Sequence, residues 1–201
     1  MTTAVLAQVS VVSGAPSFTV NAEIDIPASD FAIPVDLNGD GLNDLVLVEL
    51  WDGGSPFAGI TGAVHIAHNS GIEGKPIFLP EHMAQVALSP GLVLAAKVED
   101  IDQDGFPDLA VVTATLSGGE VQYFHNEPMP VTTKDPRRQL RYIGKMSNNH
   151  AGRAVDFIDL NRDGCKDVLM LFSGGMGNAG SGTSLLWAPG KKAGPGLPDC
   201  F

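Results

Sequence analysis

The chain has 201 residues, which is enough to bury a core as one domain or as a run of small repeats. Its formal charge of −11 argues against nucleic acid or an anionic membrane surface as a partner, and no apolar run reaches the roughly 18–20 residues of a membrane-spanning helix. The 24 Gly and 14 Pro residues favour many turns over long helices.

Short apolar runs rich in Val, Leu, Ile and Phe follow one another along the chain, separated by turn residues. This pattern is typical of strands rather than helices. One strand is expected at Ser17–Ile26, and after it the same order of elements returns three times. The first run of each unit covers Phe31–Val35, Leu92–Val98 and Ala154–Ile158.

The later runs of each unit continue the same order. The second runs, apolar on both faces as expected near the centre of stacked repeats, are Leu45–Val48, Leu109–Val112 and Val168–Phe172. The third runs are Ala63–Ala67, Val121–Phe124 and Ser184–Trp187. A weaker fourth segment closes the first two units, at Lys75–Leu79 and Leu140–Ile143. The sequence therefore predicts an all-β fold of three antiparallel repeats, each of about 60 residues.

An acidic loop lies between the first and second runs of every unit. We name the three copies loop one (36–44), loop two (100–108) and loop three (159–167). Each has Asp at positions 1, 5 and 9, Asp or Asn at position 3, and Gly at position 6. Ca²⁺ takes six to eight oxygens, which a short chain supplies by wrapping around the ion, and Gly permits the sharp turn. The repetition of this spacing predicts a metal site in each loop.

The expected ligands are the side chains at positions 1, 3, 5 and 9 and the backbone carbonyl at position 7. They are Asp36, Asn38, Asp40, Leu42 and Asp44; Asp100, Asp102, Asp104, Phe106 and Asp108; and Asp159, Asn161, Asp163, Cys165 and Asp167. We expect about three Ca²⁺ per chain, bound most tightly by loop two, which has four Asp. Mg²⁺ suits the loops less well, because it prefers strict octahedral geometry.

An EF-hand is rejected as an explanation of these loops. That motif places Glu at position 12 and joins helices, whereas this chain has Leu47, Val111 and Met170 at position 12 and joins expected strands. The Asp-x-Asp/Asn-x-Asp-Gly-x-x-Asp-Leu/Val pattern instead resembles the FG-GAP/VCBS repeat family, the calcium-bearing blades of integrin α-subunits and many bacterial surface proteins. The Phe-Gly and Gly-Ala-Pro sequences that give the family its name are altered within these repeats, so the bacterial type is the nearer match.

The resemblance implies a β-propeller in which each loop joins the first and second strands of a blade and holds calcium through the ligands named above. The expected organisation is an N-terminal segment at 1–30, whose strand completes a neighbouring blade, followed by blades at 31–90, 91–150 and 151–201. Propellers close with about four to eight blades, so three imply part of a longer chain, a homo-oligomer that completes the ring or a filament, or an open arc capped by other elements. The sequence leaves open whether Cys165 and Cys200 pair.

The expected function is a calcium-stabilised, non-enzymatic binding or structural module of a secreted or surface protein, acting in adhesion or assembly on a protein or glycan partner. Its expected location is extracellular or at the cell surface, with no signal peptide visible in this chain. The alternative is an accessory or carbohydrate-binding propeller of a polysaccharide-active enzyme or a lectin. The motifs His-Glu-x-x-His, Gly-x-Ser-x-Gly and Cys-x-x-Cys do not occur.

Overall fold

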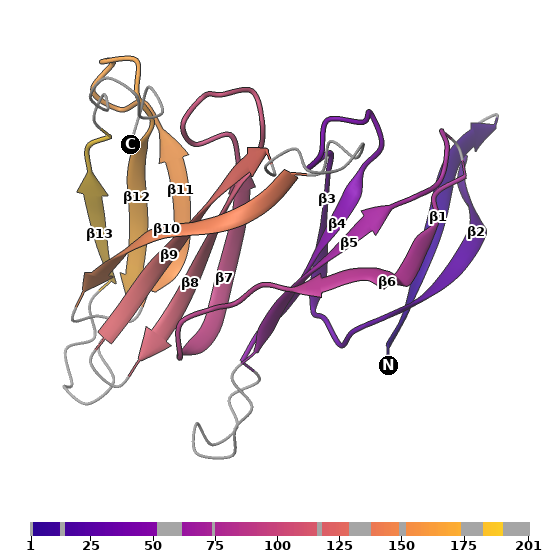
Figure 1. The fold of residues 1–201 in the computed structure, drawn as a ribbon, viewed down its shortest axis with the longest axis horizontal. Helices are drawn as coiled ribbons and strands as arrows, with labels where there is room; N and C mark the ends of the chain where they lie inside the picture. Colours follow the sequence, from indigo (N-terminus) through magenta and orange to yellow (C-terminus); the bar gives the residue numbers. More distant parts are fainter. Residues whose placement is uncertain are drawn as a thin grey trace.

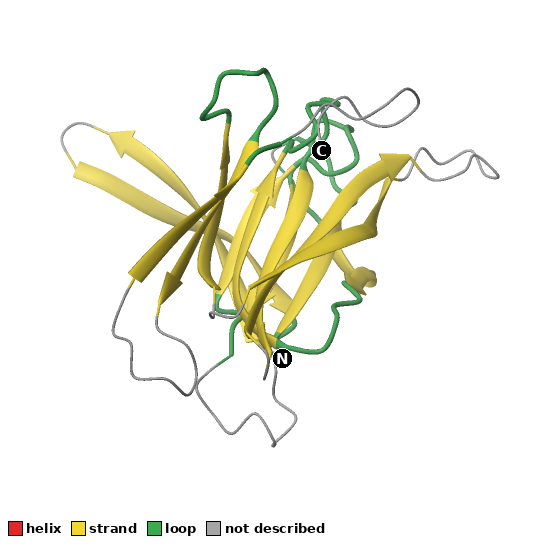
Figure 2. Cartoon of the chain, turned by 90° about the vertical axis from the view of Figure 1, so that its left-hand side faces the viewer, coloured by secondary structure: helices red, strands yellow, loops and turns green. Residues whose placement is uncertain are grey.

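The computed structural model describes residues 2–12, 15–51, 62–73, 75–115, 118–128, 138–148, 152–173 and 183–190. Within these ranges every regular element is a strand, as Figure 2 shows, which confirms the all-β class. The described part of the chain has no helix long and apolar enough to cross a membrane.

The described strands form four antiparallel sheets. The hairpin sheet contains β1 (Thr2–Val12) and β2 (Ala15–Ile26). Sheet one contains β3 (Phe31–Val35), β4 (Asp44–Glu49), β5 (Ala63–Asn69) and β6 (Phe78–Gln85). Sheet two contains β7 (Leu92–Glu99), β8 (Asp108–Thr115), β9 (Gly118–Pro128) and β10 (Arg138–Asn148). Sheet three contains β11 (Gly152–Ile158), β12 (Asp167–Ser173) and β13 (Thr183–Ala188).

The first three strands of sheets one, two and three fall on the runs that the sequence predicts. The fourth strands are longer and shifted: β6 begins at Phe78 rather than Lys75. The expected strand at Ser17–Ile26 is present as β2, but it pairs with β1, a strand that the sequence did not predict. Its expected part in completing a neighbouring blade stays a prediction.

The sheets stand side by side along the long axis of the molecule, in the order hairpin sheet, sheet one, sheet two, sheet three (Figure 1). Within sheets one, two and three, strands adjacent in sequence are also neighbours in the sheet. Antiparallel strands can be joined by short connections, so each sheet is a local unit of the chain.

The sheets pack because their central strands are apolar on both faces. On β4, Val46 and Val48 join a core cluster with Leu109 of β8, whereas Leu45 and Leu47 join a second cluster on the side of the hairpin sheet. Side chains alternate between the faces of a strand, so one continuous apolar run serves two interfaces.

The central strand of sheet two repeats this division. Leu109 and Val111 of β8 face sheet one, and Ala110 and Val112 pack with Met170 of sheet three. All four β8 side chains are fully buried. The core is therefore a series of layers between sheets, and this stacking fixes the three acidic loops relative to one another.

Candidate metal centre

The three acidic loops lie at the same edge of the stacked sheets, at the top of Figure 1. Loop one joins β3 to β4, loop two joins β7 to β8, and loop three joins β11 to β12. Each therefore connects the first and second strands of its sheet, as the sequence predicts.

The backbone of each loop turns sharply at position 6. Gly41, Gly105 and Gly164 have φ values of 85°, 91° and 89°, in the left-handed region that favours glycine. A second left-handed residue stands at position 4, and the sequence did not reveal it. There Gly39, Gln103 and Arg162 have φ values of 77°, 65° and 62°. Two of these three are non-glycine residues in a sparsely populated conformation, which the surrounding loop must hold in place.

Backbone amides hold the carboxylates of each loop in position. The position-6 N–H donates to the position-1 carboxylate, at 2.8, 3.0 and 2.9 Å for Gly41–Asp36, Gly105–Asp100 and Gly164–Asp159. The position-7 N–H donates to the position-5 carboxylate at 2.8 Å, for Leu42–Asp40, Phe106–Asp104 and Cys165–Asp163. The positions expected to bind a cation are thus ordered by the turn itself.

Loop two gathers the most negative charge. Oxygens of Asp100, Asp102 and Asp104 lie within 4.8 Å of one another. Asp100 Oδ1 and Asp102 Oδ2 are buried without a hydrogen-bond partner. Burial and the nearby charge of Asp108 raise the pKa of Asp102 to about 6. A divalent cation would satisfy both orphan oxygens and offset this repulsion, so the donor set fits the expected Ca²⁺.

In loops one and three a side chain of the loop itself donates to the position-5 carboxylate, because Asn replaces Asp at position 3. Asn38 Nδ2 donates to Asp40 Oδ2 at 2.9 Å, and Asn161 Nδ2 donates to Asp163 Oδ2 at 2.9 Å. The carboxylate at position 5 in these two loops therefore accepts from the Asn side chain as well as from the position-7 N–H. This contrast supports the expected ranking of loop two above the other loops, which stays a prediction.

The position-9 carboxylate is buried in all three loops and ties the loop to the third strand of its sheet or, in sheet three, to Gly190 just after that strand. Asp44 accepts hydrogen bonds from Leu37 N at 3.1 Å and Asn69 N at 2.8 Å. The same two bonds recur as Ile101–Asp108 and Asn126–Asp108, at 3.0 and 2.8 Å, and as Leu160–Asp167 and Gly190–Asp167, at 3.0 and 2.9 Å. Sequence reasoning expected only a metal ligand here, whereas the structure also makes this Asp a clamp.

Burial and hydrogen bonds act in opposite directions on these clamps. Burial raises the pKa of Asp108 although Asn126 N and Ile101 N donate to it. At Asp167 the pKa is lowered, because hydrogen bonds from Trp187 and the backbone outweigh burial. Among the expected carbonyl ligands at position 7, Leu42 and Phe106 are half-buried. Cys165 is buried and disulfide-bonded, and Cys200 lies outside the described residues.

The family comparison identifies the stretch that contains loops two and three. Residues 100–170 match the family described as FG-GAP-like repeat. The match begins at position 1 of loop two and ends within β12, just beyond loop three. It confirms the resemblance drawn from the acidic loops for this part of the chain. No curated protein matches the chain.

The matched segment is tied to loop one by contacts between residues far apart in sequence. Asn126 Nδ2 donates to Leu37 O at 2.7 Å, and the ring of Phe106 lies where a side chain at Gly39 would stand, with Cε1 2.9 Å from an ideal Cβ. Within the matched segment, Gln103 Nε2 donates to Gly164 O of loop three at 2.8 Å. The three loops therefore form one connected edge.

The clamp predicts a stability effect that needs no metal. In excess chelator, we expect Asp108→Ala to lower the free energy of unfolding by about 2–4 kcal/mol, because the buried amides of Ile101, Asp102 and Asn126 lose their acceptor. Asp104→Asn is the control: it keeps an oxygen for Phe106 N, so we expect a change within about 0.5 kcal/mol. Urea denaturation measures both, and equal losses in the two variants would contradict the assignment.

Proposed function

We propose that this chain is a calcium-stabilised, non-catalytic binding or structural module of a secreted or surface protein, built from β-propeller blades. The observation that carries the proposal is the set of carboxylates ordered by the turns of three loops at one edge, with two buried, unpartnered oxygens in loop two. The match of residues 100–170 to the FG-GAP-like repeat supports the same reading.

In this proposal residues 31–90, 91–150 and 151–201 are the blades, preceded by the segment 1–30. Two observations support the division. Each acidic loop joins the first and second strands of its own sheet. Equivalent positions of β4 and β8 face the following sheet, so the stacking relation repeats between neighbours.

The role of the ion is structural. Positions 1, 3, 5 and 9 offer only oxygen, which suits a hard cation such as Ca²⁺. A site that assembles only in the folded chain adds its binding free energy to stability. Because the position-9 clamps join each loop to its sheet, a bound ion would stiffen the edge from which the sheets extend.

Calcium titration tests this function. We expect saturation at about three ions per chain. The melting temperature should rise with Ca²⁺ and fall with chelator, because free Ca²⁺ at 100 times Kd adds about 2.7 kcal/mol per site to the stability of the folded chain. Asp100→Asn should weaken calcium binding at loop two. Glu73 is an exposed acid outside the loops, so Glu73→Gln should leave the calcium affinity and the melting temperature unchanged. Calorimetry and thermal melting give both readouts, and no heat of binding would reject the calcium role.

Sheet three presents an apolar face that supports self-association. Leu169 and Leu171 of β12 stand at the positions that Val46 and Val48 occupy on β4 and that Ala110 and Val112 occupy on β8. In the first two sheets these positions are buried against the next sheet. In sheet three, Leu171, Leu185 and Trp187 are 39%, 67% and 45% exposed.

We propose that a second copy of the chain covers this face with its own sheet three, because the face is apolar and hence self-complementary in a two-fold dimer. We expect a dimer by light scattering at high micromolar concentration and a monomer for Leu185→Lys. Ile72→Lys, at 66% exposure in the connection between β5 and β6, is the matched control and should stay dimeric. A monomeric wild-type chain would contradict self-association and favour a further sheet of a longer chain.

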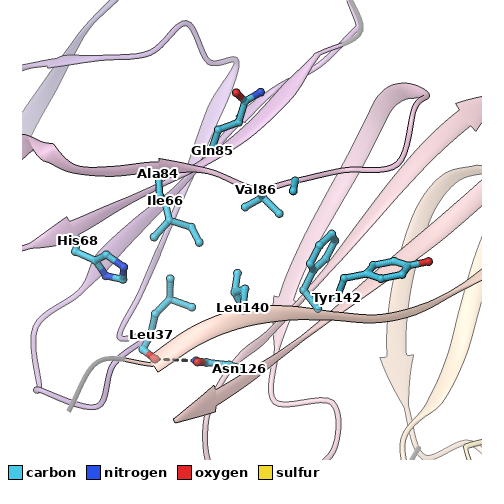
Figure 3. A pocket seen from close by; sticks show the side chains of 11 residues that line it. Leu37, Ile66, His68, Ala84, Gln85, Val86, Asn126, Leu140 and Tyr142 are labelled. Atoms are coloured by element: carbon cyan, nitrogen blue, oxygen red, sulfur yellow. Dashed lines mark hydrogen bonds between the residues drawn. The ribbon is translucent and has the colours of Figure 1, made fainter. Parts of the chain in front are cut away.

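A cavity supports carbohydrate binding as the second candidate function, either in a lectin or in an accessory propeller of a polysaccharide-active enzyme. It measures about 340 Å³ and lies between sheets one and two. Figure 3 shows Ile66 and Leu140 around the space, with His68 at one end and Tyr142 at the other. Pockets for small ligands combine such apolar walls with a few polar groups.

A glycan array tests this second candidate. We expect discrete glycan hits that are lost in Tyr142→Ala, because the Tyr142 ring is 42% exposed at the cavity and packs edge-on against Phe124 with the centroids 5.6 Å apart. Trp187→Ala removes an aromatic ring of similar exposure outside the cavity and should keep the hits. An array without hits for the wild-type chain would leave the structural role as the better reading.

A further inference from the structure

His125, at the end of β9, contacts two carboxylates of loop two at once. Its Nδ1 lies 3.1 Å from Asp108 Oδ1 and 3.1 Å from Asp102 Oδ2. The contact with Asp108 has hydrogen-bond geometry, whereas Asp102 Oδ2 is buried without a hydrogen bond. Asp102 is 1% exposed and the His125 side chain 12% exposed, so the three groups form an enclosed cluster with donor atoms within 4.8 Å of one another.

This combination of one imidazole nitrogen and two carboxylate oxygens suits a transition-metal dication better than Ca²⁺. Ca²⁺ takes oxygen ligands, whereas Zn²⁺ accepts both nitrogen and oxygen. Around a tetrahedral ion with bonds of about 2.0–2.1 Å, neighbouring donors stand about 3.3 Å apart. The observed 3.1 Å separations are close to this spacing. An ion between the three atoms would also satisfy the orphan oxygen of Asp102.

We propose that loop two binds one transition-metal dication of the Zn²⁺ class through Asp102 Oδ2, Asp108 Oδ1 and His125 Nδ1, with water completing the coordination. The ion replaces the proton on Nδ1, which moves to Nε2 in the other neutral tautomer of the imidazole. The site shares two carboxylates with the proposed calcium site of loop two, so the two ions compete. The inference goes beyond the calcium proposal and does not require that Ca²⁺ bind.

The other two loops lack this donor set. In loop one, His68 Nδ1 lies 3.4 Å from Asp44 Oδ2, but position 3 is Asn38, whose Oδ1 accepts a hydrogen bond from Asp40 N. In loop three, Gly190 is equivalent to Asn126, because its N–H donates to the position-9 Asp. The residue before it is Pro189 rather than histidine. Among the three acidic loops, loop two therefore holds this donor set and the other two serve as internal controls.

Cobalt is the probe that tests the site. Co²⁺ titrated into the full chain after chelator treatment should give visible absorption that saturates at one ion per chain, and added Zn²⁺ should displace it. His125→Gln should lower the affinity for Co²⁺ and Zn²⁺ by about 100-fold or more, because it removes the only nitrogen ligand. His68→Gln is the matched control and should leave that affinity unchanged. If loop two also binds Ca²⁺, that ion should compete with Co²⁺ in the wild-type chain.

Several outcomes would overturn the proposal. Equal Co²⁺ affinity in His125→Gln and the wild-type chain would mean that His125 only donates a hydrogen bond to Asp108 or pairs as a cation with both carboxylates. Uniform binding of about three Co²⁺ per chain would mean that the ion uses the oxygen ligands of every loop. Nitrogen-15 NMR of the unmodified chain gives a second readout: Zn²⁺ must shift the Nδ1 signal of His125, whether or not the variant folds. Failure of calcium binding alone would leave this site intact.

Discussion

The buried position-9 carboxylate is the interaction on which the arrangement of this molecule depends. Asp44, Asp108 and Asp167 each accept backbone N–H groups from the start of the loop, one in the first loop and two in each of the others. Each also accepts one N–H from the third strand or from the residues just after it. Buried carboxylates are costly unless they are hydrogen-bonded, so the loop cannot move away from the sheet without leaving a charge unsatisfied. One residue type at one position thus ties the acidic loop to its sheet.

Stacking of these units follows from strand periodicity. Side chains of β8 alternate between Leu109 and Val111 on one face and Ala110 and Val112 on the other, and every one is fully buried. A strand that is apolar on both faces needs a sheet on each side, because otherwise one face meets water. The same periodicity leaves Leu171 and Leu185 of sheet three exposed at the end of the stack. The apolar residues on both faces of the central strands therefore pack the sheets together and also leave an exposed apolar face on sheet three.

Local patterns predicted the strands around each loop and the left-handed glycine at position 6, because both depend on residues within a few positions of one another. The sequence missed what depends on distant residues. Asn126 reaches Leu37 across 89 positions, and His125 meets Asp102 only because β9 returns beside loop two. The sequence also did not predict the left-handed conformation of Gln103 and Arg162, because neither residue type favours a positive φ.

Similar loops in one chain still differ in what they offer a cation. Loops one and three place an Asn amide against the position-5 carboxylate, which lowers their need for an ion, whereas loop two leaves two buried oxygens without a donor. Loop two is also the central one, joined to loop one through Asn126 and to loop three through Gln103. Coupling between sites is reciprocal. If the proposed ion orders loop two, it would therefore act on both neighbours, because hydrogen bonds join this loop to each of the other two.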